Sequence, residues 1–435
     1  MKKLLVLGAG TAGTMVVNKL RRRLGDDWLI QVVDPSDLHY YQPGYLFIPF
    51  GTYSPGQVVK PIQALLADGV EFVHGEVDGV LPAENAVVLR DGRRLGYDYL
   101  VVATGTSPRP DQTPGMLDGG EWHRTIHDFY TYQGSIALRH ALRLFEGGRV
   151  VVQVVEMPIK CPVAPLEMAF LAEAHFRSRG LRDQVDLTYV TPLSGAFTKP
   201  VASRLLGSML DERKIRLESD FVVERVDADR RVLVSYDERE VPFDLLITVP
   251  LNMGADFLAR SGMADELNYV PVDKHTQLST QYPNVFALGD ASDIPASKAG
   301  SVAHFSVEVF VENFLQHVSG RPMTGSFDGH ANCYIESGDG KALLIDFNYD
   351  VEPLPGTYPV PRLGPFHLLE ETRANHLGKL AFRWMYWNLL VPGRPIPLPA
   401  HMSMAGKVRP TTTDVPTTEE TTEETTGAAA STPEV

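Results

Sequence analysis

The chain has 435 residues, enough for two or three domains, and its 44% hydrophobic and 22% charged residues are ordinary for a globular protein. The net charge of −14 comes partly from six acidic groups in a tail, 410–435, without Lys or Arg, and it argues against nucleic acid as a partner. With only two cysteines, the chain is not a disulfide scaffold, and no apolar stretch approaches the ~20 residues of a membrane-spanning helix. The apolar segment at the start is too short for a cleavable signal peptide, so we expect a cytoplasmic origin.

The chain begins with a strand, a glycine-rich loop and a helix. Residues 3–7 predict a buried strand, 14–24 a helix and 29–34 a second strand. The loop between the first two carries three glycines, Gly8, Gly10 and Gly13. Such a loop alone is a weak signal, and a glycine-rich turn is the alternative. Asp34 at the end of the next strand, placed for a ribose hydroxyl, favours dinucleotide binding.

A second strand–loop–helix unit follows short strands at 71–75 and 86–89. Its strand is predicted at 149–156 and its helix at 167–179. A nicotinamide-binding loop would carry glycines here, but this one reads Met157-Pro-Ile-Lys-Cys161-Pro-Val-Ala-Pro165. A thiol at a helix N-terminus favours the reactive thiolate, whereas the alternative is a buried inert cysteine. We expect Cys161 to take part in sulfur chemistry rather than in NADH binding.

The remaining elements complete a two-unit α/β pattern. Strands are predicted at 245–249 and 284–290 and a helix at 301–316. Two strands at 330–350 flank the hairpin signal Ser337-Gly-Asp-Gly340, and Cys333 lies on the first of them. The Thr-, Glu- and Pro-rich tail 410–435 has little apolar surface to bury and is expected to be disordered.

Two segments favour FAD over NAD. Tyr97-Asp-Tyr-Leu-Val-Val-Ala-Thr104-Gly105 and Val285-Phe-Ala-Leu-Gly289-Asp290 resemble the paired signatures of disulfide-reductase-like flavoproteins. The resemblance covers residues 1–320. It implies two Rossmann-like units, an aspartate that reaches the FAD ribityl chain, and a following helix whose N-terminus points at the flavin.

The loop with Cys161 carries a more specific resemblance. Cys161-Pro-Val-Ala-Pro-Leu-Glu167 is similar to the C-x-x-A-P-x-E motif of sulfide:quinone oxidoreductases and of the related flavocytochrome c sulfide dehydrogenase flavin subunit. Tyr41-Gln-Pro-Gly44, Pro295-Ala-Ser-Lys298-Ala-Gly300 and Cys333 also match that family. The resemblance implies that Cys161 and Cys333 form a redox-active pair beside the flavin. It also implies Glu167 as a proton acceptor, with an exposed first-turn carboxylate as the alternative.

The segment 377–390 resembles the quinone end of that family. Lys379-x-x-Phe382 is similar to its K-x-x-F motif, and the apolar loop 45–50, with Phe47, is expected to help line the pocket. Trp384, Tyr386 and Trp387, with basic residues nearby, suit a helix in the lipid headgroup region, whereas an ordinary core helix is the alternative.

The expected fold is α/β, with two Rossmann-like units of the disulfide-reductase type and a C-terminal membrane-associating region. We predict an FAD domain at 1–110 and 251–330, a second Rossmann-like domain at 111–250, a quinone and membrane region at 331–409, and the tail at 410–435. The resemblance implies a monotopic respiratory flavoprotein of the cell membrane that oxidises sulfide to zero-valent sulfur or polysulfide and reduces a membrane quinone. No metal is expected, and a homo-oligomer is left open. The expected cofactor residues are Gly8, Gly10, Gly13, Asp34, Gln42, Pro43, Thr104, Gly105, Gly289, Asp290, Lys298 and Gly300.

One departure from the family pattern matters. Many members have a third cysteine where this chain reads His123-Arg-Thr-Ile-His127-Asp128, so product release by exchange with a third thiol is excluded. Tyr40 and Tyr41 occupy the early loop, so we expect non-covalent FAD. His127 is either a base or a surface or capping histidine. The alternatives are a type II NADH:quinone oxidoreductase, a flavocytochrome c-like sulfide dehydrogenase and a flavin redox sensor.

Overall fold

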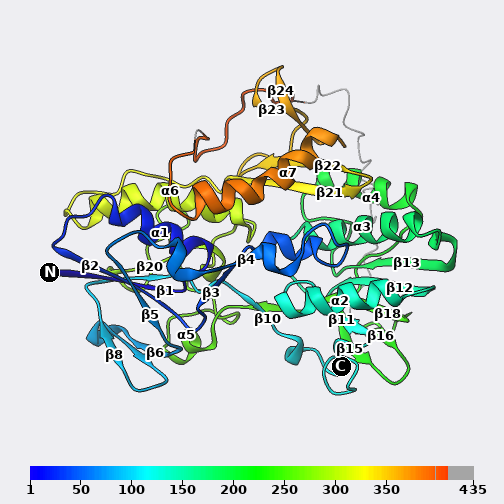
Figure 1. Ribbon diagram of the computed structural model, residues 1–435, viewed down its shortest axis with the longest axis horizontal. Coiled ribbons are helices and arrows are strands. Elements are labelled where there is room, and N and C mark those ends of the chain that lie inside the picture. Colours follow the sequence, from blue (N-terminus) through cyan, green and yellow to red (C-terminus); the bar gives the residue numbers. More distant parts are fainter. Residues whose placement is uncertain (397, 410–435) are drawn as a thin grey trace, which may run out of the picture.

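The computed structural model describes residues 1–396 and 398–409. Two parallel sheets, each flanked by helices, lie side by side, and a third sheet with helix α7 packs across one side of both (Figure 1). The predicted tail at 410–435 lies outside the described residues. The expectation of two parallel Rossmann-like sheets is confirmed.

The first sheet has the strand order β20-β9-β1-β2-β5, and every neighbouring pair is parallel. Helices α1 and α6 pack together against one of its faces (Figure 1). Because helices and loops cover the sheet, its central strands are nearly continuous apolar runs. The bounds are Lys2–Leu7 (β1), Thr11–Arg21 (α1), Trp28–Asp34 (β2), Val70–His74 (β5), Tyr99–Val102 (β9), Val285–Ala287 (β20) and Gly300–His317 (α6).

The second sheet has the order β11-β18-β12-β13-β14 and is also parallel throughout. Helix α3 follows β12 and packs on β12 and β13, as the crossover of a strand–helix–strand unit does. The bounds are Ile126–His127 (β11), Tyr132–Leu144 (α2), Gly148–Val154 (β12), Ala164–Ser178 (α3), Val185–Val190 (β13), Pro200–Glu212 (α4), Arg216–Glu218 (β14) and Leu245–Val249 (β18).

The third sheet, β21-β22-β24-β23, joins two antiparallel hairpins through one parallel contact between β22 and β24. Strand β21 packs on α3, and α7 packs on β21, β22 and β24, so this sheet links the second unit to the C-terminal helix (Figure 1). The predicted hairpin is therefore confirmed. The bounds are Ala331–Gly338 (β21), Lys341–Phe347 (β22), Gly356–Val360 (β23), Gly364–Leu368 (β24) and Arg373–Met385 (α7).

In the described part of the chain, four small antiparallel sheets accompany the two parallel sheets. They pair β3 with β4, β10 with β19, β6 and β8 with β7, and β15 and β17 with β16. The bounds are Leu38–Tyr40 (β3), Val59–Pro61 (β4), Val77–Leu81 (β6), Ala86–Leu89 (β7), Arg94–Gly96 (β8), Ser107–Pro108 (β10), Val223–Asp227 (β15), Val232–Ser235 (β16), Glu240–Pro242 (β17), Asn252–Met253 (β19) and Asp256–Arg260 (α5).

The C-terminal helix differs in part from its prediction. Trp384 is 64% exposed, but Tyr386 and Trp387 are buried in a π-helical turn over Tyr386–Leu390, against His39 and Tyr41. The alternative of a core position therefore holds for Tyr386 and Trp387, because this end of the segment packs into the core next to the glycine loop. Within the described ranges, no helix is both long enough and apolar enough to cross a membrane.

Candidate active site

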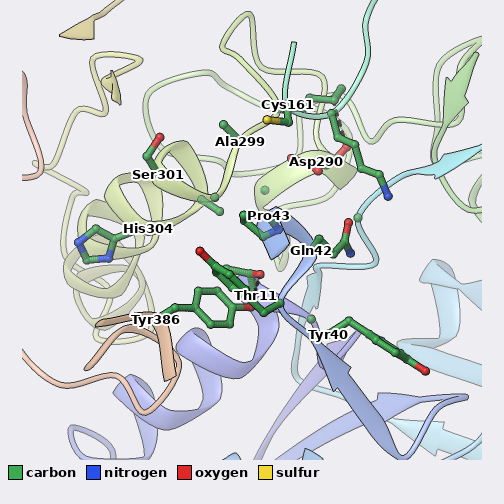
Figure 2. A pocket seen from close by; sticks show the side chains of 18 of the residues that line it. Thr11, Tyr40, Gln42, Pro43, Cys161, Asp290, Ala299, Ser301, His304 and Tyr386 are labelled. Carbon is green, nitrogen blue, oxygen red and sulfur yellow. Dashed lines mark hydrogen bonds between the residues drawn. The ribbon is translucent and has the colours of Figure 1, made fainter. Parts of the chain in front are cut away.

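One cavity of about 910 Å³ lies where the two parallel sheets meet β21 and α7. Its walls come from the glycine loop after β1, the turns after β9 and β20, the loop before α3, strand β21 and helix α7. Figure 2 shows Cys161 and Asp290 at one end of it, and Thr11 and Tyr386 at the other. The cavity therefore brings together segments from both ends of the chain.

The glycine loop has the geometry that a dinucleotide site needs. Gly8 has a φ of +96°, and a Cβ there would lie 2.5 Å from the carbonyl oxygen of Ala103. A Cβ on Gly13 would lie 1.9 Å from the carbonyl oxygen of Gly8, whereas a Cβ on Gly10 would meet open space. The first and third glycines thus allow close packing, and the second leaves room for a ligand to approach the backbone.

Asp34 ends β2 beside this loop, and its carboxylate is fixed by the backbone. One oxygen accepts a hydrogen bond from the N–H of Ala9 at 2.8 Å and the other from the N–H of Ser36 at 2.9 Å. Burial raises the pKa of Asp34, and these two donors oppose that rise. Asp34 lines the cavity at the carboxyl edge of the sheet, which is where such folds bind ligands.

The other expected cofactor residues lie around the same space. All of them except Gly13, which packs behind the loop, line the cavity. A Cβ on Gly105 or Gly300 would also meet open space. Within the described part of the chain, the buried hydroxyl of Thr104 has no hydrogen-bond partner. Open glycines and an unpartnered polar atom fit a large polar ligand such as FAD.

Asp290 and Lys298 place buried charges at this site. Burial raises the pKa of Asp290 and lowers that of Lys298, and each group partly offsets the shift of the other. The Lys298 ammonium donates to the carbonyls of Asp290 (3.1 Å) and Ser292 (2.9 Å) and lies 3.6 Å from the ring centre of Tyr269. Lys298 thereby holds the turn that carries Asp290.

Cys161 has a left-handed backbone, with φ of +49°, which is uncommon for residues other than glycine. Its N–H donates to the carbonyl of Lys298 at 2.6 Å. Its own carbonyl accepts from the N–H of Ala164 at 2.9 Å and the hydroxyl of Tyr130 at 3.0 Å. These bonds hold a strained conformation of the kind that concentrates at functional sites.

Cys333 reaches the same cavity from β21, and both cysteines are free thiols. Burial, reinforced by the Glu167 carboxylate, raises the pKa of Cys333 to about 12 and raises that of Cys161 well above its usual value. The expectation of a helix-stabilised thiolate at Cys161 is therefore wrong for the reduced protein. Helix α3 begins only at Ala164, and the dipole field, which acts mainly within the first turn, is outweighed by desolvation.

Glu167 is buried, so the alternative of an exposed first-turn carboxylate is wrong. It forms an ion pair with Lys379 of α7 and accepts a hydrogen bond from the N–H of Glu336 at 2.6 Å. Burial raises the pKa of Glu167, and Lys379 opposes that rise. Burial alone would lower the pKa of Lys379, but Glu167 and Glu336 raise it. Lys379 thus lines the cavity and forms the ion pair with Glu167 there.

The two expected quinone aromatics are placed differently. Phe382 lines the cavity, with its ring centre 6.3 Å from that of Tyr41. Phe47 is not among the residues that line the cavity; it lies beneath Lys379, whose ammonium is 5.5 Å from its ring centre. Tyr45 and Leu46 of the same 3₁₀ helix (Gln42–Phe47) face the cavity instead.

A network that the sequence did not reveal ties α7 to the glycine loop. The Tyr386 hydroxyl lies 2.7 Å from Thr11 Oγ1 and 2.7 Å from His39 Nε2. His39 Nδ1 lies 2.8 Å from the carbonyl oxygen of Ala9. A buried tyrosine hydroxyl needs a hydrogen-bond partner. A prediction that Tyr386 is buried would therefore have implied such a partner elsewhere in the chain.

His127 is neither at the surface nor in the cavity. It is buried on β11, and its Nε2 lies 3.1 Å from the carbonyl oxygen of Arg124. Burial lowers its pKa. Because it does not line the cavity, it does not take the place of the missing third cysteine.

Comparisons with known proteins agree with this geometry. Residues 2–151 match the family model described as pyridine nucleotide-disulphide oxidoreductase. The mitochondrial sulfide:quinone oxidoreductase of Mus musculus is 26% identical over 398 residues, covering 90% of this chain and 86% of that protein. Its counterpart in Schizosaccharomyces pombe is 29% identical over 419 residues, covering 89% and 90%. Over about 90% of its length, the chain is similar to proteins of the sulfide:quinone oxidoreductase family.

A solved structure extends the match to the fold. The sulfide:quinone oxidoreductase of Aquifex aeolicus superposes with a TM-score of 0.76 at 20% identity, covering 89% of this chain and 92% of that one. The match to the pyridine nucleotide-disulphide oxidoreductase model, together with these similarities, indicates an FAD-dependent oxidoreductase. The glycine loop and Asp34 in the cavity have the geometry that such a cofactor needs.

Proposed function

We propose that this protein oxidises sulfide at Cys161 and Cys333 and passes two electrons through non-covalently bound FAD to a membrane quinone. The supporting observation is that the only two cysteines of the chain, one in the loop before α3 and one on β21, line one cavity together with the glycine loop. A pair of cysteines beside a flavin site is the arrangement that sulfur oxidation requires, and the glycine-free loop before α3 disfavours a nicotinamide. FAD would supply two-electron acceptance from sulfur and two-electron donation to the quinone.

The proposed sulfur chemistry starts from an oxidised Cys161–Cys333 pair. Hydrosulfide attacks the disulfide, so that this S–S bond breaks, a cysteine persulfide forms and the other cysteine leaves as a thiolate. A second hydrosulfide attacks the outer sulfur of the persulfide and releases hydrodisulfide, the first member of the polysulfides. Loss of two electrons and one proton then returns the thiol and thiolate to the disulfide. No third cysteine is needed.

The proposed acceptor side lies at α7. Phe382 and Tyr41 offer aromatic surfaces for a quinone ring, and both line the cavity. Leu377 and Trp384 on the same helix are 63% and 64% exposed. We propose that this exposed apolar surface of α7 rests on the lipid headgroup region as a peripheral contact with the cell membrane, where a quinone tail stays in the bilayer.

The proposed division of the chain follows the three sheets. Residues 1–110 and 251–330 would bind FAD, and 111–250 would present Cys161. Residues 331–409 would supply Cys333 and the quinone side.

Anaerobic titration of the FAD-loaded protein tests the proposal. Sulfide should bleach the flavin absorbance, and a soluble short-chain quinone should then restore it. NADH should leave the flavin oxidised. Bleaching by NADH but not by sulfide would overturn the proposal in favour of a type II NADH:quinone oxidoreductase.

A further inference from the structure

A row of titratable side chains leads from the cysteines towards the surface. Glu167, behind the two cysteines, pairs with Lys379. The next acid is Glu336 on β21, whose carboxylate oxygens Oε1 and Oε2 lie 3.0 and 2.9 Å from the ring nitrogen Nδ1 of His376. The side chains of both acids are 1% exposed, whereas those of Lys379 and His376 are 12% and 21% exposed. Groups that can bind protons therefore extend from the cavity to the partly exposed His376.

The backbone fixes the spacing of these groups. On the open edge of β21, the N–H of Glu336 donates to Glu167 and the carbonyl of Tyr334 accepts from Lys379 at 3.2 Å. His376 and Lys379 lie three residues apart on α7, so they share one helix face. Within residues 1–396 and 398–409, Lys379 pairs directly with Glu167 alone. Its flexible side chain is the element able to turn towards Glu336, whose charge acts on it.

We infer that Glu167, Lys379, Glu336 and His376 form the exit path for the proton released at the sulfur centre, with His376 delivering it to solvent. This inference rests on the proposed function, because only sulfide oxidation releases that proton. Glu336 and His376 are positioning residues here, since they act through Glu167.

Each transfer balances without a further reactant. When the cysteine pair loses two electrons to FAD, the S–H bond of the remaining thiol breaks and its proton moves to the Glu167 carboxylate. The Lys379 ammonium gives one proton to Glu336 and takes one from Glu167, so that its own charge is unchanged. Protonated Glu336 passes the proton to the His376 imidazole, and the imidazolium releases it to water. A base beside the remaining thiol favours this step, because burial raises the pKa of both cysteines.

Stopped-flow mixing of the FAD-loaded protein with sulfide, in weak buffer with a pH-indicator dye, tests this path. Flavin bleaching and proton release are followed together. His376→Ala should slow both by about tenfold or more, the scale of a lost proton-transfer group. Added imidazole should restore both rates, which a purely structural defect would not allow. Glu336→Gln, similar in shape, should slow both rates without rescue by imidazole.

His367→Ala is the matched control. His367 lies on the neighbouring strand β24, is exposed and pairs with Glu370, away from Glu167. It should leave both rates unchanged. Wild-type rates in His376→Ala, or slow rates that imidazole does not restore in a variant with an unchanged melting temperature, would overturn the inference. If His376→Ala melts early, His376→Gln replaces it under the same criteria. Wild-type protein that sulfide fails to bleach would instead refute the proposed function.

Discussion

Burial in the cavity raises the pKa of both Cys161 and Cys333. Their reactivity therefore depends on groups that take the proton, not on a lowered thiol pKa. Glu167 is the carboxylate whose charge acts on both cysteines, and Lys379 pairs with it and opposes the rise that burial causes in its pKa. At the residue scale, the sulfur site is a pair of thiols with a buried acid–base couple.

Alkylation of the reduced protein tests this description. The pKa of Cys333 is about 12 against its ordinary 9.0, so at pH 8 its thiolate fraction is lower by about a thousandfold. Iodoacetamide should label the folded protein far more slowly than the guanidine-unfolded protein. Because the pKa of Cys333 is higher in the folded than in the unfolded protein, the contribution of this thiol to the free energy of unfolding is fully present below pH 9. The contribution is lost as the pH rises towards 12. Equal labelling of folded and unfolded protein at pH 8 would contradict the buried thiol.

At the element scale, α7 and the turn after it form one wall of the cavity, although they belong to neither Rossmann-like sheet. Strands were predictable because apolar runs identify them: β7 and β18 match their predicted ranges residue for residue. Helix α1 begins at Thr11, earlier than predicted, because the glycine loop itself forms the first turn. Helix α3 begins at Ala164, since Pro165 fits a first turn. The partners of Tyr386 and Trp387 were not predictable, because Thr11 and His39 are near the other end of the chain.

Tyr386→Phe tests the tie between this segment and the glycine loop. Burial lowers the pKa of His39 to about 4, so the ring is neutral; it donates to Ala9 and accepts from Tyr386. Loss of the hydroxyl leaves a buried nitrogen unpaired, which costs about 2 kcal/mol. The melting temperature should fall and FAD should dissociate more readily. Tyr236→Phe, at a 71% exposed position, is the control; an equal effect there would contradict the assignment.

Leu377→Glu tests the membrane contact of α7. Leu377 is 63% exposed and does not line the cavity, so the change should spare sulfide oxidation. Replacing an inserted apolar side chain by a charge should reduce co-sedimentation with anionic lipid vesicles on the order of tenfold. Leu144→Glu on α2 is the matched control because Leu144 is 62% exposed. Similar losses in both variants would refute a specific contact through α7.

For the whole molecule, the parallel sheets were predictable from local patterns, whereas the site depends on contacts between distant segments. The glycine loop and Asp34 follow one another in the chain, so their juxtaposition could be expected. The family resemblance implied that Cys161 and Cys333 lie close together, and both line one cavity. The ion pair between Glu167 and Lys379 was not predicted. Both depend on the third sheet, because its strand β21 packs on α3 and its strands β21, β22 and β24 carry α7.

Flavin reduction by sulfide in cysteine variants tests the central claim most directly. Cys161→Ser and Cys333→Ser should each retain bound FAD, because neither side chain forms the glycine loop, and dithionite should still bleach the flavin. Sulfide should bleach the wild-type flavin under anaerobic conditions and leave both variants oxidised. Bleaching of either variant by sulfide at the wild-type rate and extent would contradict sulfide oxidation at this cysteine pair.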